Sequence, residues 1–233
     1  MKTYKNLFEK VAELKTLYHA YLKARKGKNN KKEVLKFTYN LEEELITLQS
    51  ELLNGTYKTG KYRKFIVHDP KTREISALPF RDRIVQHAIC MIIEPIFDRS
   101  FIYDSYACRK GKGTHKGIER LQKFLKTENP YALKCDIKKY FQSINHSLLK
   151  RMLRKKISDS RLLGLIDDII DSYDVRNVVE TGISEHPENP KKKQEGFLET
   201  GVPIGNLTSQ LFANIYLNEL DKYIKHVLKI KFY

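Results

Sequence analysis

A turn that runs directly into an amphipathic helix, over residues 201–221, constrains this chain more than any other segment. The turn contains Pro203, which cannot donate a backbone hydrogen bond and must therefore precede the helix. Apolar residues then recur at helical spacing: Leu211, Ile215 and Leu220. The helix entrance carries small residues, which let a flat ligand or another backbone come close: Gly205, Thr208, Ser209 and Ala213. Composition alone thus suggests a ligand-binding helix start.

Residues 131–137, Tyr-Ala-Leu-Lys-Cys-Asp-Ile, predict a short buried strand with Asp136 near its end. A strand-end aspartate can simply cap the helix that follows, and this structural role stays open. A carboxylate here also suits Mg²⁺, which takes hard oxygen ligands, few of them from protein. Phe141 follows five residues later, and taken alone it is better explained by core packing than by a binding role.

A basic β-hairpin is predicted upstream. The β-prone runs 63–67 and 75–78 flank turn residues 69–72, and five cations lie on or near them: Lys61, Arg63, Lys64, Lys71 and Arg73. Such a hairpin is either a solvated charged surface or a phosphate-binding one. Arginine suits the second role because its planar fork pairs with two phosphate oxygens.

Two further blocks lie between the hairpin and Asp136. Residues 79–87, Pro-Phe-Arg-Asp-Arg-Ile-Val-Gln-His, place Asp82 as an early-turn helix acid. Residues 105–115, Ser-Tyr-Ala-Cys-Arg-Lys-Gly-Lys-Gly-Thr-His, set two glycines among three basic residues. The amides and cations of this loop can follow a phosphate backbone, although its spacing is not that of a Walker loop.

In this order the blocks closely resemble the motifs of reverse transcriptases, from about Tyr62 to the C-terminus. The Ile-Gly-x-x-x-Ser-Gln form of residues 204–210 is similar to the version in diversity-generating retroelements, whereas group II intron enzymes typically show Gln-Gly-x-x-x-Ser-Pro. The resemblance implies an α+β fold with right-hand polymerase fingers and a partial palm. Its expected parts are an N-terminal helical region over 1–60, fingers over 61–130 and a partial palm over 131–233.

The resemblance also implies roles for individual residues. Asp136 would be the catalytic residue and a ligand of two Mg²⁺ ions, which clamp the attacking and leaving oxygens of phosphoryl transfer. Arg73 is the best-matched triphosphate ligand, and whether Arg63 or Lys64 assists it is left open. Phe141 would exclude a 2′-hydroxyl. The other nucleotide-binding residues would be Ile137, Ile204 and Gly205, and the nucleic-acid contacts would be Arg83, Arg109, Lys110, Lys112, Ser209 and Gln210.

Composition agrees with a nucleic-acid partner. The 233 residues carry 44 lysines and arginines against 28 acids, a net charge of +16 spread along the chain, and such a field attracts polyanions. A membrane surface is the rival, but no window approaches 18 apolar residues, so we expect no membrane partner. Three cysteines without metal spacing, and no signal-peptide core, predict reduced thiols in a cytoplasmic protein, with Cys90 and Cys135 in apolar surroundings.

Helical patterns cover much of the remaining chain. They predict helices over residues 4–24, 32–53, 81–93, 116–126, 146–156 and 159–172. Pro95 is expected to end or kink the third of these, and Ser158 to cap the last. Adjacent Asp167 and Asp168 fall in a helical pattern and do not share a face, so a metal role is not favoured. Residues 181–199 are expected to form a loop or a weak hairpin.

The chain ends in Lys-Ile-Lys-Phe-Tyr, which resembles the strand leading into the family's catalytic Tyr-x-Asp-Asp hairpin, and the Asp-Asp pair is not in the sequence. We therefore expect a C-terminally truncated RNA-directed DNA polymerase, a nucleotidyltransferase by family that is inactive alone. The full-length enzyme would add deoxynucleoside triphosphates to a DNA or RNA primer on an RNA template. The resemblance implies error-prone cDNA synthesis for a diversity-generating retroelement, with a small helical accessory protein. The alternatives are a defence or abortive-infection relative, and a non-catalytic basic nucleic-acid-binding module.

Overall fold

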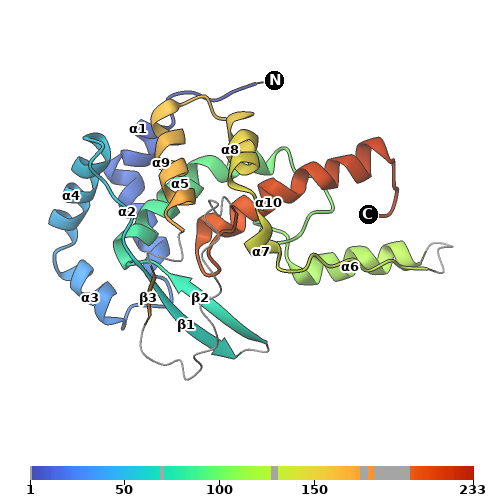
Figure 1. The fold of residues 1–233 in the computed structure, drawn as a ribbon, viewed down its shortest axis with the longest axis horizontal. Coiled ribbons are helices and arrows are strands. Elements are labelled where there is room, and N and C mark those ends of the chain that lie inside the picture. The colour runs from blue at the N-terminus through green and yellow to red at the C-terminus, as the bar shows by residue number, and fades with distance from the viewer. Residues whose placement is uncertain (1, 69–70, 127–130, 174–177, 181–199) are drawn as a thin grey trace, which may run out of the picture.

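The computed structural model describes residues 2–68, 71–126, 131–173, 178–180 and 200–233, which form a mixed helix-and-sheet fold (Figure 1). The helices are α1 (Phe8–Ala12), α2 (Leu14–Arg25), α3 (Lys32–Tyr39), α4 (Leu41–Leu53), α5 (Phe80–Asp98), α6 (Thr114–Leu125), α7 (Tyr140–Ser143), α8 (His146–Arg154), α9 (Ser160–Asp171) and α10 (Leu207–Lys222), which continues as a π-helical turn over Tyr223–Val227. The strands are β1 (Tyr62–His68), β2 (Thr72–Ala77) and β3 (Val178–Glu180).

Helix α5 lies at the centre of the helical body and packs against α2 on one side and α10 on another (Figure 1). Its apolar residues recur every three or four positions, and Ile84, Ala88 and Ile93 have no exposed surface. Pro95 does not end the helix, which runs on to Asp98. None of the helices in the described ranges is both long and apolar enough to cross a membrane.

The predicted hairpin is present and lies beside the helical body (Figure 1). Strands β1 and β2 pair antiparallel from Arg63 opposite Ala77 to His68 opposite Thr72. Strand β3 adds to the other edge of β1 in parallel, so the sheet order is β2-β1-β3. The turn chemistry of the sequence therefore located this element correctly, whereas residues 181–199 lie outside the described residues.

The helices predicted over residues 4–24 and 32–53 are each divided into two helices in the structure. The backbone of Glu13 is extended and separates α1 from α2, and the backbone of Asn40 separates α3 from α4. Asparagine favours such breaks because its side chain competes for backbone hydrogen bonds. Local periodicity continues across both breaks, so the sequence pattern did not reveal them.

The sequence predicted Ser158 as the N-cap of α9, but the N-cap in the structure is Asp159. Ser158 instead pairs with the N-terminal segment, since its backbone N–H donates to the Tyr4 carbonyl at 3.0 Å. The Asp159 carboxylate accepts from Leu162 at 3.0 Å, and also from the backbone N–H groups of Leu7 at 2.6 Å and Phe8 at 2.9 Å. One carboxylate thus caps both α9 and α1.

The predicted strand over residues 131–137 was wrong. These residues are exposed and irregular, and no strand of the described ranges pairs with them. A strand is stable only when a neighbour satisfies its backbone groups, and an apolar pattern cannot supply that neighbour. Cys135 is accordingly exposed, while Cys90 is buried as expected. The final residues, 229–233, are irregular as well.

Substituting Asp159 tests the shared cap. Burial alone would raise the pKa of this carboxyl, but the backbone N–H donors outweigh it and hold the pKa below its usual value. The ionised Asp159 carboxylate therefore stabilises the folded state at a pH above the unfolded-state pKa, and this stabilisation is lost as the pH falls through the folded-state pKa. We expect Asp159→Ala to lower the free energy of unfolding by about 1–2 kcal/mol at neutral pH, and the difference to shrink in acid.

Urea unfolding at pH 7 and pH 3 measures both effects. Asp168→Ala, which removes an exposed aspartate from the same helix, is the control and should change stability by less than about 0.5 kcal/mol. An equal loss in the two variants would contradict the capping role of Asp159.

Candidate nucleotide and nucleic-acid site

The turn over residues 200–206 is hydrogen-bonded to the segment that contains Phe141. The Gly201 amide donates to the Ile144 carbonyl at 2.7 Å, and the Val202 amide donates to the Phe141 carbonyl at 2.8 Å. His146 is buried, and its Nε2 donates to the Gly201 carbonyl at 2.6 Å. These contacts fix the turn next to α7 and α8.

The same turn meets the hairpin on its other side. The Ser76 amide of β2 donates to the Ile204 carbonyl at 2.9 Å. Gly205 has φ +115°, and a Cβ atom there would lie 2.6 Å from Ile75 Cγ2. Only glycine satisfies both conditions, because other residues rarely adopt this backbone and have no space for a side chain. The turn therefore joins the hairpin to α10.

The strand register shows which cations face this junction. Side chains two residues apart share one face of a strand, so Arg73 lies on the face of Ile75. Arg63 pairs with Ala77, which lies on that face too, and directly opposed residues point the same way. Arg63 and Arg73 therefore share the face whose Ile75 side chain meets Gly205.

Lys64 lies on the opposite face. It pairs with Ser76 in the register, and its Nζ forms an ion pair with Glu74 Oε1 at 3.0 Å. The sequence left open whether Arg63 or Lys64 assists Arg73. The register places the Arg63 side chain on the Arg73 face, and the Lys64 side chain pairs with Glu74 on the other face.

Phe141 is half-buried at the entrance of α7. Its ring centroid lies 5.9 Å from that of Tyr140, whose hydroxyl donates to the Ala213 carbonyl of α10 at 2.6 Å. Tyr140 and His146 thus anchor the site, and sequence reasoning missed both roles. The signal for Tyr140 was its place beside Phe141, but nothing in the sequence indicates a partner 73 residues away.

Asp136 and Ile137 lie in the exposed segment before α7, and the Ile137 side chain is 44% exposed. Among the described residues, no three histidine, cysteine, aspartate or glutamate side chains come together in a way that could hold a metal ion. The residues present here therefore do not make a complete Mg²⁺ site, and Asp136 stays a predicted ligand.

Two predicted nucleic-acid contacts have internal partners. The Arg83 guanidinium donates to Glu33 and lies 5.5 Å from the Phe80 ring. Arg109 Nε donates to Asp98 at 2.6 Å, and its Nη1 donates to two carbonyls of the loop that it closes. These contacts support a structural role for both arginines.

The other predicted contacts differ in exposure. Lys110 and Gln210 are exposed, and Gln210 lines a small cavity of about 70 Å³ between α5, α10 and the loop over residues 101–109. Lys112 Nζ donates to the Tyr103 carbonyl at 2.7 Å. Ser209 is 2% exposed, so its side chain packs inside the fold and does not lie on a surface that a nucleic acid can reach.

Residues 62–233 match the family model described as reverse transcriptase (RNA-dependent DNA polymerase). The chain belongs to the reverse transcriptase family. The matched range contains the hairpin, the Phe141 segment and the turn that joins them, so the family resemblance of the sequence blocks is confirmed.

Relatives of this reverse transcriptase chain include Protein YkfC of Escherichia coli (strain K12), 31% identical over 187 residues, 78% of this chain and 45% of the relative. Another is the group II intron-encoded protein LtrA of Lactococcus lactis subsp. cremoris, 27% identical over 82% of this chain and 30% of the relative. The chain therefore spans less than half the length of these relatives.

A solved structure described as a partial Cas6-RT-Cas1–Cas2 complex has a similar fold. One of its chains matches 94% of this chain and 35% of its own length, with a TM-score of 0.53 and 18% sequence identity. At this identity the match supports the fold alone, and it agrees with the mixed helix-and-sheet architecture.

Replacing Gly205 tests the junction between turn and hairpin. We expect Gly205→Ala to lower the free energy of unfolding by about 1–3 kcal/mol, because the new Cβ meets Ile75 and the backbone is strained. The Ser76 amide should exchange its hydrogen faster, since its acceptor on Ile204 shifts. Urea unfolding and hydrogen exchange measure the two effects.

Gly164→Ala is the matched control. Gly164 lies in α9 with open space around its Cβ position, so the change should raise stability by up to about 1 kcal/mol. If Gly205→Ala is as well tolerated as Gly164→Ala, the junction does not depend on this glycine.

Proposed function

We propose that this chain forms the nucleotide-binding part of an RNA-directed DNA polymerase. The observation that carries the proposal is the turn over residues 200–206, which hydrogen-bonds to both the Phe141 segment and β2. Three sequence blocks far apart in the chain thereby form one surface. On this view the hairpin belongs to the fingers of the polymerase and residues 131–233 to its palm.

The reaction proposed for the whole protein is templated addition of a deoxynucleotide to a primer. The primer 3′-hydroxyl attacks the α-phosphorus of a deoxynucleoside triphosphate, a new P–O bond forms, and pyrophosphate leaves. Arg73 and Arg63 would bind the triphosphate from one face of the hairpin, because guanidinium groups pair with phosphate oxygens. The Phe141 ring would lie against the sugar and leave no room for a 2′-hydroxyl.

The partners proposed for this surface are an RNA template and a DNA or RNA primer. The net charge of +16 supports this, because neutralising phosphates with lysine and arginine releases counterions and favours binding. If the chain binds RNA but the extended protein never incorporates nucleotides, the non-catalytic binding module is the better description. Incorporation without a template would favour the defence-type relative.

The deciding test is primer extension by a protein that continues past Tyr233. The protein that is assayed must include the family's Tyr-x-Asp-Asp hairpin, which would supply the other two carboxylates. In that protein we expect Asp136→Asn to reduce extension by at least about 100-fold, because the amide keeps the shape and removes the charge. The rate of labelled deoxynucleotide incorporation on an RNA template with Mg²⁺ measures this effect.

Asp167→Asn is the control, since Asp167 pairs with Arg154 on the helical body and should leave extension unchanged. A wild-type rate in Asp136→Asn would make Asp136 a structural residue and would remove it from the catalytic site.

Two observations bear on the subtype. Ile204 and Gln210 differ from the Gln-Gly-x-x-x-Ser-Pro form that is typical of group II intron enzymes, which has glutamine and proline at these two positions. These residues favour error-prone synthesis of the diversity-generating type. The names of the relatives favour the intron-encoded branch, since they include a group II intron-encoded protein and nuclear intron maturases of Arabidopsis thaliana. We propose the error-prone type because the Ile-Gly-x-x-x-Ser-Gln form of residues 204–210 resembles the diversity-generating version.

Ile204→Gln tests that proposal. A glutamine amide can hydrogen-bond near the incoming nucleotide, and isoleucine offers only stiff apolar bulk. A positioned hydrogen bond is worth about 1 kcal/mol, which is roughly a fivefold change. We therefore expect Ile204→Gln in the extended protein to lower misincorporation about fivefold, most clearly opposite template adenine.

Sequencing cDNA copied from one RNA template compares the variants. Ile204→Leu is the control and should keep the wild-type error spectrum, because its side chain stays apolar. Both variants keep the backbone carbonyl that accepts from Ser76, so the hairpin contact is unchanged. Equal error spectra in Ile204→Gln and wild type would mean that Ile204 is a packing residue.

A further inference from the structure

Tyr103 is a large aromatic side chain that the fold leaves 70% exposed. It lies in the loop between α5 and α6. Lys112 Nζ sits 3.7 Å from its ring centroid and donates to the Tyr103 carbonyl, so this cation is held over the ring by two contacts. The Arg120 guanidinium carbon lies 5.4 Å from the same centroid. The ring is thus fixed beside two cations while most of its surface faces solvent.

A buried carboxylate organises this arrangement. The Asp104 side chain is 5% exposed and accepts from Arg120 Nε at 2.8 Å and from the Tyr106 hydroxyl at 3.1 Å. Lys225 Nζ, from the π-helical turn after α10, lies 3.9 Å from its Oδ2. Groups from the loop, α6 and the C-terminal helix therefore meet at one carboxylate, and the orientation of the loop is determined by the fold.

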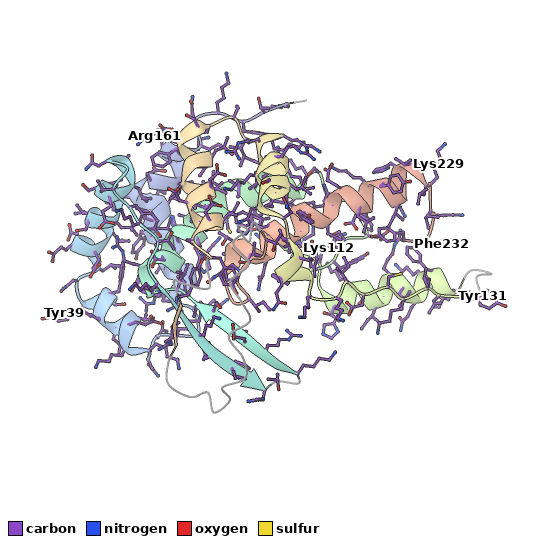
Figure 2. All side chains as sticks on the ribbon, viewed as in Figure 1. Tyr39, Lys112, Tyr131, Arg161, Lys229 and Phe232 are labelled. Atoms are coloured by element: carbon purple, nitrogen blue, oxygen red, sulfur yellow. The ribbon has the colours of Figure 1, made fainter. Side chains whose placement is uncertain are left out.

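The arrangement continues along α6. The Arg120 guanidinium carbon lies 4.6 Å from the centroid of the Phe124 ring, and that ring lies 5.1 Å from the Phe232 ring. Lys112 lies near the start of α6, and Phe232 lies farther along the helix (Figure 2). Lys110 and Lys116 are exposed near the same end of the helix. Arg120 therefore lies between the Tyr103 and Phe124 rings, and Phe232 lies beyond Phe124.

We propose that Tyr103 is a stacking platform for an unpaired base of single-stranded nucleic acid. An exposed ring supplies a π-face that any base can stack on, and flanking cations pair with the adjoining phosphates. The chemistry fits a polyanion better than a protein surface, since Lys112 and Arg120 lie beside the ring and Lys110 and Lys116 are exposed in the same loop and the first turn of α6. The proposal rests on the proposed function in one respect: the strand is the template or primer of the polymerase.

If a base stacks on Tyr103, removing the ring should weaken the binding of single-stranded RNA and leave the binding of duplex RNA unchanged. The probe is a single-stranded RNA of about twelve nucleotides that carries 2-aminopurine, whose fluorescence is quenched by stacking. We expect Tyr103→Ala to weaken its binding to the 233-residue chain about tenfold and to abolish the quenching. Tyr103→Phe should bind within about twofold of wild type, because the face of the ring is kept.

Three controls separate stacking from charge and from folding. Tyr39→Ala removes another exposed tyrosine, at the end of α3 and far from Lys112 (Figure 2), and should leave binding unchanged. Binding of a blunt RNA duplex should be unaffected by Tyr103→Ala. Lys110→Ala should lower the salt slope of binding by about 0.7, whereas Tyr103→Ala should lower affinity without changing that slope.

The proposal is overturned if wild-type chain does not quench the probe, if Tyr103→Ala binds single strands as tightly as wild type, or if it weakens duplex binding equally. Loss of binding in Tyr103→Phe would also overturn it, because the hydroxyl would then be the contact. The assay requires no nucleotide incorporation, so failure of polymerase activity and failure of stacking are distinguished.

Discussion

Backbone hydrogen bonds made by one short turn, residues 200–206, hold the candidate site together. Through Gly201 and Val202 the turn binds the segment around Phe141, and through Ile204 it binds strand β2. These bonds hold β2 and the Phe141 segment against opposite sides of one turn. Because the bonds are made by backbone atoms, they depend on the conformation of the turn, which at Gly205 requires glycine.

The sequence predicted elements whose signals are local. The hairpin was found because turn residues separate two β-prone runs, and the helices over His146–Arg154 and Ser160–Asp171 were found because their periodicity is strong. The breaks at Glu13 and Asn40 were missed, since helical spacing continues across them. The strand at residues 131–137 was wrong because a strand depends on a partner that no local pattern can specify.

The site was predicted in the same partial way. The order of the sequence blocks indicated the reverse transcriptase family, which the family match over residues 62–233 confirms. The strand register places Arg63 and Lys64 on opposite faces, which local sequence could not show, and their roles at a triphosphate stay predictions. Tyr140, His146 and Asp104 could not be assigned from the sequence, because each acts through a residue distant in the chain or on another element. Long-range polar contacts of this kind carry no periodic signal.

The close approach between Gly205 and Ile75 also limits how the hairpin can move. Contact blocks motion toward the turn, and the bond from the Ser76 amide to the Ile204 carbonyl restrains motion away from it. A rotation about that junction would displace each residue in proportion to its distance from the pivot. Arg73, two residues from Ile75, lies near the pivot, and Thr72 and His68 lie farther out. A tilt of the hairpin about this junction would therefore move Arg73 less than it moves Thr72 and His68.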